Sequence, residues 1–286
     1  MKKYYLLPLF FLFLTISFSQ NKKNSSDDVL KASDLSGLKF RSVGPAFMSG
    51  RIADIAINPE NENEWYVAVG SGGVWKTINS GTTWNPITDD QSFYSTGCIT
   101  IDPNNSSKIW LGTGENVGGR HVGIGHGIYV SENGGKNWKS MGLKSSEHIS
   151  KIIVSPNDSN VVFVASQGPL WSSGGERGLF KTNDGGKSWN NVLSVNEWTG
   201  VTDIAIDNEN PNILYAATWQ RHRNVASYMG GGPGTSIYKS VDNGNTWNEI
   251  KNGLPKSNLG KIGLVISPFD SSILYAAVVT DRRKGA

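Results

Sequence analysis

Two carboxyl groups stand just after strand-like runs, where a side chain can face a ligand. Glu115 follows KIWLGTG (108–114), and Asp281 follows ILYAAVVT (273–280). Cleavage of a glycosidic bond needs two carboxyl groups, about 5 Å apart for retention of configuration and further apart for inversion. Glu115 and Asp281 are therefore the candidate catalytic residues; the structural alternative for Glu115 is an ion pair with Arg120. Other acidic residues predicted to share their surroundings are Glu147, Glu176 and Glu197.

Cationic and aromatic side chains gather in three long insertions, at residues 114–127, 167–178 and 219–236. Arginine recognises oxygen acceptors through paired hydrogen bonds, and Trp and Arg are frequent binding hot spots. The alternative is that the insertions are ordinary solvent-exposed loops. However, of the eight arginines only Arg41 lies outside the face that these insertions and the links between repeats are predicted to form. The candidate ligand-binding residues are Arg51, Arg120, His121, Trp171, Glu176, Arg177, Trp198, Trp219, Arg221, His222 and Arg223.

Metal and cofactor chemistry find little support in the sequence. Glu115, His121 and His126 could face a metal, but a Gly-rich loop does not preset ligand geometry. The glycine runs are not phosphate loops because no helix follows them, and no GxSxG nucleophile motif is present. We expect no metal and no cofactor.

A turn motif recurs at long intervals along the chain. It indicates which secondary-structure elements position the candidate catalytic and ligand-binding residues. Each copy has Ser or Thr, then Asn or Asp, then Gly, then Trp. The copies are GGVWKTINSGTTWNPI (72–87), GIYVSENGGKNWKSM (127–141), GLFKTNDGGKSWNNV (178–192) and SIYKSVDNGNTWNEI (236–250). A period of more than fifty residues with β chemistry in every copy predicts the blades of a β-propeller.

Each repeat predicts four antiparallel strands. An alternating apolar run such as IADIAINP (52–59) comes first, a second run such as EWYVAVG (64–70) follows a short turn, and the motif supplies two more strands. The prediction is an all-β propeller of four-stranded blades, with four complete blades and two strands of a fifth. We expect an incomplete propeller, with residues 38–43 as a strand that could complete a final blade.

The motif residues have structural roles. The Asn or Asp can accept backbone N–H groups across the turn, and the Trp can bury its ring against a neighbouring sheet. The alternative is that these residues bind calcium, but the motif contains too few carboxylates for a calcium-binding loop. The residues concerned are Asn79, Trp84, Asn133, Trp138, Asp184, Trp189, Asp242 and Trp247. In up-and-down blades these turns lie at one end, and the long insertions lie at the other.

The repeats resemble Asp boxes, also called BNR repeats, over residues 37–286. The longer unit is similar to the sortilin N-terminal domain family and to xyloglucanase-type glycoside hydrolase propellers. This resemblance implies a scaffold that binds polypeptide segments or glycans. In the xyloglucanase type a catalytic Asp is expected before a Gly-Gly pair, where this chain has Ser71. Glu115 and Asp281 occupy the comparable places in the second and fifth blades.

The predicted function is therefore binding of an extended polymer, glycan or polypeptide, on the Arg- and Trp-rich face. The alternative is a xyloglucanase-like glycoside hydrolase that uses carboxylates on that face. A sialidase is not favoured, because Arg51-Ile52-Ala53 only partly matches the Arg-Ile-Pro motif expected there.

The N-terminus predicts export. Residues 1–19 carry two lysines, an apolar run and a small-residue cleavage pattern, as in a secretory signal peptide, and residues 20–36 resemble a polar linker. We expect a secreted, periplasmic or cell-surface protein without stable membrane insertion. Without residues 1–19 the chain has 25 Lys and Arg against 24 acids, a balance that does not favour nucleic acid. Cys98, the single cysteine, is expected to be a buried structural thiol.

Overall fold

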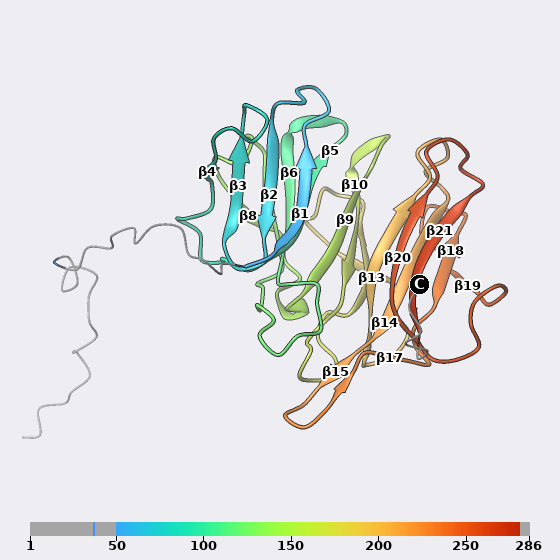
Figure 1. The fold of residues 1–286 in the computed structure, drawn as a ribbon. Coiled ribbons are helices and arrows are strands. Elements are labelled where there is room, and N and C mark those ends of the chain that lie inside the picture. The colour runs from blue at the N-terminus through green and yellow to red at the C-terminus, as the bar shows by residue number, and fades with distance from the viewer. Residues whose placement is uncertain (1–36, 38–49, 281–286) are drawn as a thin grey trace, which may run out of the picture. The chain divides into compact units, whose positions relative to one another are not determined.

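The computed structural model describes Gly37 and residues 50–280. Within these residues, four antiparallel sheets of four strands follow one another, each in sequence order (Figure 1). The first two sheets contain β1 (Ile52–Ile57), β2 (Trp65–Val69), β3 (Gly73–Thr77) and β4 (Asn85–Pro86), then β5 (Thr96–Asp102), β6 (Asn105–Thr113), β7 (Ile128–Ser131) and β8 (Lys139–Ser140).

The next two sheets repeat this plan. They contain β9 (Ile149–Ser155), β10 (Asp158–Ser166), β11 (Gly178–Thr182) and β12 (Asn190–Leu193), then β13 (Thr199–Ile206), β14 (Leu214–Gln220), β18 (Ile237–Ser240) and β19 (Asn248–Ile250). A further sheet pairs β20 (Leu259–Ile266) with β21 (Leu274–Thr280) and with the short β17 (Gly231–Gly232). A short 3₁₀ helix, η2 (Lys144–Ser146), precedes β9.

The predicted four-stranded antiparallel units are thus confirmed, whereas one insertion is more ordered than expected. Residues 219–236 were expected to be a loop, but β15 (His222–Arg223) and β16 (Tyr228–Met229) form a hairpin within it. β17 then pairs with β20. The pairs are only two residues long, and no alternation marks so short a strand in the sequence. The expected signal peptide (1–19), linker (20–36), strand at 38–43 and Asp281 lie outside the described residues.

The four turn motifs share one set of hydrogen bonds. In the fourth copy, Ser240 Oγ donates to Asp242 Oδ1 at 2.7 Å and accepts the Gly244 N–H at 2.9 Å. Asp242 Oδ1 also accepts the Thr246 N–H at 2.9 Å. The same bonds recur around Asn79, Asn133 and Asp184. Each motif therefore closes a tight hairpin between the third and fourth strands.

The core lies between successive sheets, and the motif tryptophans pack into it. Trp138 Nε1 donates to the Ile87 carbonyl at 3.2 Å, and Trp189 Nε1 donates to the Met141 carbonyl at 2.7 Å. Both acceptors belong to the preceding repeat, as expected for rings buried against a neighbouring sheet. Trp247 packs into the cluster between the third and fourth sheets, whereas Trp84 pairs with Trp65 of its own sheet.

First strands of successive sheets lie side by side: β1 contacts β5, β5 contacts β9, β9 contacts β13, and β13 contacts β20. Figure 1 shows the β6–β7 insertion and the β15–β16 hairpin at the same, lower end of the sheets. We call residues 114–127, 167–178 and 219–236 the long-loop rim. The first strands begin at this end, so the rim lies beside the space that they enclose.

Candidate binding site at the long-loop rim

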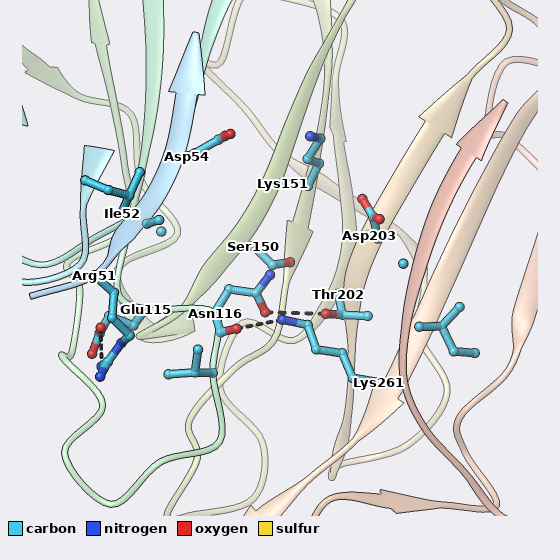
Figure 2. A pocket seen from close by; sticks show the side chains of 15 residues that line it. Arg51, Ile52, Asp54, Glu115, Asn116, Ser150, Lys151, Thr202, Asp203 and Lys261 are labelled. Atoms are coloured by element: carbon cyan, nitrogen blue, oxygen red, sulfur yellow. Dashed lines mark hydrogen bonds and ion pairs between the residues drawn. The ribbon is translucent and has the colours of Figure 1, made fainter. Parts of the chain in front are cut away.

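A cavity of about 380 Å³ lies where the first strands begin (Figure 2). At this level β1, β5, β9, β13 and β20 each pair with their second strand through a register irregularity. A bulge takes a residue out of the ladder and re-aims its side chain. The residues inside the irregularities that line the cavity are Ala53, Gly97, Ser150, Thr202 and Lys261. We call this space the central cavity.

Charged side chains of both signs line the central cavity. Asp54, Lys151, Asp203 and Lys261 come from four different first strands (Figure 2). Both carboxylates accept backbone N–H groups of the following sheet. Burial raises the pKa of Asp203. Burial, and then the positive charge of Arg221, lowers the pKa of the Lys261 amine to about 8. The cavity thus contains a lysine that releases its proton more readily than an exposed one.

Glu115, the first candidate catalyst, is buried at the edge of this cavity. Its Oε1 forms an ion pair with Arg51 Nη2, and its Oε2 accepts the Gly123 N–H at 2.7 Å. An ion pair with Arg120 was the expected structural alternative, and that partner was wrong. Arg120 is exposed and its Nη2 lies 3.4 Å from the Val225 carbonyl oxygen. Both oxygens of Glu115 therefore hold neighbouring chain segments.

A strap of residues 115–118 crosses from the second sheet towards the fourth and fifth (Figure 2). The backbone carbonyls of three successive strap residues each accept a hydrogen bond from a cationic side chain. The bonds are Lys261 Nζ to Asn116 O (2.7 Å), Arg221 Nη1 to Val117 O (2.7 Å) and Arg223 Nη2 to Gly118 O (2.9 Å). We call Lys261, Arg221 and Arg223 the cation row.

The side chain of Asn116 ties the strap to the third and fourth sheets. Its Oδ1 accepts hydrogen bonds from Gln167 Nε2 and, at 3.4 Å, from Thr202 Oγ1. Gln167 Nε2 also donates to Thr202 Oγ1 at 3.2 Å. Among the described residues, the buried Gln167 Oε1 has no hydrogen-bond partner. Polar contacts thus hold the strap in place, and one oxygen of this network, Gln167 Oε1, is left unpaired in the described part of the chain.

Arg177 and Arg221, both expected to contact ligand, are buried among backbone carbonyls. Arg221 is 0% exposed, its Nη2 donates to Gly168 O at 3.3 Å, and its Nε has no partner in Gly37 or residues 50–280. Burial lowers the pKa of Arg221 to about 9 and that of Arg177 to about 10. The Arg177 guanidinium donates to the carbonyls of Gln167, Pro169, Ser172, Gly174 and Trp198. Arg177 therefore shapes its own loop.

The aromatic candidates differ in exposure. Trp171 is 46% exposed, and Trp198 is half-buried with its ring centroid 4.3 Å from that of His222. Trp219 is buried, and Lys261 and Arg221 stand over its ring at 5.5 and 5.3 Å from the centroid. Trp171 and the Trp198–His222 pair are thus the aromatic surfaces that a ligand can reach.

The remaining candidates lie on the same rim. Glu176 accepts hydrogen bonds from the backbone N and Oγ of Ser145, at 2.8 and 2.9 Å. His121 is exposed, and the half-buried Arg223 stands 4.5 Å from the centroid of the Tyr228 ring.

Cys98 is buried, and burial raises the pKa of its thiol. In the described part of the chain, no group of three or more His, Cys, Asp or Glu could hold a metal ion.

Several lining residues were missed from the sequence: Asn116, Thr202 and Lys261, together with Asp54 and Asp203. The sequence contained a signal for some of them. Asp54, Lys151 and Asp203 interrupt the apolar first-strand runs at the same register position in three of the repeats. No local sequence pattern indicated that Asn116 contacts residues of other sheets.

The family whose sequence model is described as "Sortilin, neurotensin receptor 3" (Sortilin-Vps10) matches residues 126–261. Among curated proteins, a xyloglucanase of Hypocrea jecorina is 22% identical over 263 residues, which are 79% of this chain and 29% of that protein. A xyloglucanase of a Paenibacillus species is 24% identical over 218 residues, 68% of this chain and 20% of its own length. The chain spans less than a third of the length of these relatives.

Solved structures confirm the fold class. The GH74 enzyme of Niastella koreensis superposes with a TM-score of 0.58 at 19% identity, over 82% of this chain and 35% of that one. The GH74 xyloglucanase of Xanthomonas campestris gives 0.56 at 18% identity, over 81% and 35%. The chain forms part of a β-propeller. It is related to sortilin-domain and xyloglucanase-type propellers, as the repeats predicted.

Proposed function

We propose that this chain binds a polysaccharide across the long-loop rim, with the polymer lying over the mouth of the central cavity. The repeated first-strand bulge is the observation that carries this proposal, because each of β1, β5, β9, β13 and β20 contributes a residue to one common cavity. Bulges are frequent next to functional sites, where they re-aim a side chain. Loops on a rigid scaffold then supply the contacts.

The nature of the polymer is argued from the relatives and from the exposed rings. The curated relatives are xyloglucanases, which supports a polysaccharide over a polypeptide. Trp171 and the Trp198–His222 pair offer flat surfaces on which sugar rings can stack. The cavity supplies polar groups that can fix the orientation of hydroxyl groups, as in other ligand pockets.

Binding is tested by calorimetry of the chain with a panel of neutral and acidic polysaccharides. Trp171→Ala is expected to weaken binding of the best ligand by about tenfold, the scale of a lost aromatic hot spot. Phe269→Ala is the matched control, because Phe269 is 97% exposed in the β20–β21 turn, at the other end of the sheets. The proposal fails if no polysaccharide binds, or if both variants lose affinity equally.

Glycan hydrolysis is the second candidate, favoured by the xyloglucanase relatives. Glu115 and Asp281 are the carboxyl groups proposed for it, and Asp281 lies outside the described residues. Glu115→Gln keeps the acceptor for Gly123 and removes the acidic group. Abolished turnover with intact polysaccharide binding supports catalysis by Glu115. Unchanged turnover removes that role, and no turnover by the natural sequence leaves binding alone.

Export is proposed from residues 1–19, whose pattern is that of a signal peptide. The described residues contain no helix that is long and apolar enough to span a membrane. Sequencing of the exported protein is expected to find a new N-terminus near Gln20. An intact N-terminus in a membrane fraction would contradict cleavage.

A further inference from the structure

The cations of the rim lack acidic partners. Among the described residues the ion pairs are Arg51–Glu115, Lys76–Glu64, Lys108–Glu132 and Lys251–Glu249. None of these includes the cation row, Arg120 or Arg177. These five cationic side chains therefore have no carboxylate within 4.0 Å in the part of the chain that the structure describes.

This arrangement is electrostatically unbalanced. Burial of a charge without an opposite charge is costly, and like charges held close together repel. The charge of Arg221 disfavours protonated Lys261, and the charge of Arg177 disfavours protonated Arg221. The negative charges of Glu147, Glu197 and Asp203 raise the pKa of these cationic groups and so favour their protonated forms. None of these acids lies within ion-pair distance of them in the described residues. The excess positive charge remains on the rim.

The strap offers the cation row only neutral acceptors, because the carboxylate of Glu115 is paired with Arg51. Its carbonyl oxygens accept hydrogen bonds from the cation row but bring no negative charge. Within the described ranges, Arg221 Nε has no acceptor. Lys261 lines the cavity and contacts the strap at Asn116, whereas Arg223 of β15 contacts it at Gly118. Arg120 contacts the Val225 carbonyl in the β15–β16 hairpin. An extended ligand that follows the strap therefore meets cations at both of its ends.

We propose that the polysaccharide of this rim is acidic, a polyuronate whose carboxylates bind Lys261, Arg223 and Arg120 across the strap. This inference rests on the proposed function and adds the charge of the ligand to it. Carboxylates form stronger hydrogen bonds with guanidinium and ammonium groups than neutral hydroxyl groups do. An acidic polypeptide would also satisfy the charge, but the Trp198–His222 pair and the xyloglucanase relatives favour a sugar polymer.

The test compares hexagalacturonate with its methyl ester, with a xyloglucan oligosaccharide and with poly-glutamate, by calorimetry on the full chain. Hexagalacturonate is expected to bind most tightly, and its affinity is expected to fall as NaCl is raised. Arg120→Gln and Lys261→Gln are each expected to weaken it about tenfold, the scale of a lost charged hydrogen bond. Lys187→Gln is the control, because Lys187 is exposed in the third turn motif, at the opposite end of the sheets.

Each outcome decides one question. Equal affinity for the ester, equal losses in the control, or tighter binding of poly-glutamate overturns the acidic-polysaccharide assignment. Tight binding of xyloglucan with none of hexagalacturonate overturns this inference and leaves the proposed function standing. Binding of no polysaccharide defeats both. Arg120 is exposed, so its variant is expected to fold, and an unchanged thermal unfolding midpoint verifies this.

Discussion

Asp54 and Asp203 perform the same task in different sheets. Asp54 Oδ2 accepts the N–H of Ile99 at 3.0 Å, and Asp203 Oδ2 accepts the N–H of Leu264 at 2.8 Å. In both cases the acceptor lies on a first strand, just after the bulge, and the donor lies on the first strand of the next sheet. The same side chains that line the central cavity therefore also join successive sheets around it.

Asp203→Ala is expected to lower the free energy of unfolding by about 1–3 kcal/mol, because it leaves partly buried backbone N–H groups without an acceptor. The donors concerned belong to Ile204 and Leu264. Asp203→Asn keeps one oxygen acceptor and is expected to lose less. Urea denaturation measures both, with the exposed Asp89→Ala as control. Equal stabilities of the Asp203→Ala and Asp89→Ala variants would contradict this role.

The turn motif can be tested at its glycine. Gly244 has φ +74°, and an added Cβ would stand 2.6 Å from Phe163 Cε1. Gly244→Ala is expected to cost about 1–2 kcal/mol for the left-handed backbone and about 1–3 kcal/mol for the clash. Gly253 has φ +84° with nothing within 4 Å, so Gly253→Ala is expected to show the backbone cost alone. Similar unfolding free energies for the two variants would mean that the motif does not press on Phe163.

The fold could be predicted from the sequence because its determinants are local and repeated. The motif around Asp242 contains its hydrogen-bond donors and acceptors within seven residues, and the same set recurs at each repeat. Strand alternation then fixed the order and direction of the strands in each sheet. Trp138 and Trp189 each reach the preceding repeat as expected, whereas Trp84 pairs with Trp65 of its own sheet.

The site was predicted only as a region, because its contacts join residues far apart in the sequence. Arg177 and Arg221 were correctly placed in rim insertions, but their type suggested ligand contact, whereas they bind backbone carbonyls. Asn116 and Lys261 meet across 145 residues, a pairing without a local pattern. The partner of Glu115 was likewise assigned to the nearby Arg120 and not to the more distant Arg51.

The strap can be displaced at one glycine. An added Cβ at Gly118 would collide with the ring and hydroxyl of Tyr228, whereas at Gly119 its nearest neighbour would be Val122 Cγ2 at 3.7 Å. Gly118→Ala is expected to release the strap from the cation row and to speed acetylation of Lys261. A loss of ~1.4 kcal/mol in strap stability corresponds to about a tenfold change in the open population. Mass spectrometry measures the rate, and identical rates in the Gly118→Ala and Gly119→Ala variants would mean that the strap does not shield Lys261.

His148 predicts a loss of stability in acid. It is buried, and its Nδ1 has no hydrogen-bond partner in the described part of the chain. Burial, followed by the charge of Arg221, lowers its pKa to about 3. Below pH 6.5 the unfolded chain binds this proton and the folded chain does not. The free energy of unfolding is therefore expected to fall between pH 6.5 and pH 3 by up to about 1.4 kcal/mol per pH unit. His148→Gln should flatten this fall, and the exposed His121→Gln should not; parallel curves for all three proteins would exclude His148 as the cause.

The binding face is tested most directly by hydrogen exchange with bound oligosaccharide. Mass spectrometry of the chain, with and without a saturating xyloglucan or galacturonan oligosaccharide, locates the protected amides. We expect protection in residues 114–127, 167–178 and 219–236, and no change in the turn motifs around Asn79, Asn133, Asp184 and Asp242. Protection of the turn motifs with an unchanged long-loop rim would contradict the account.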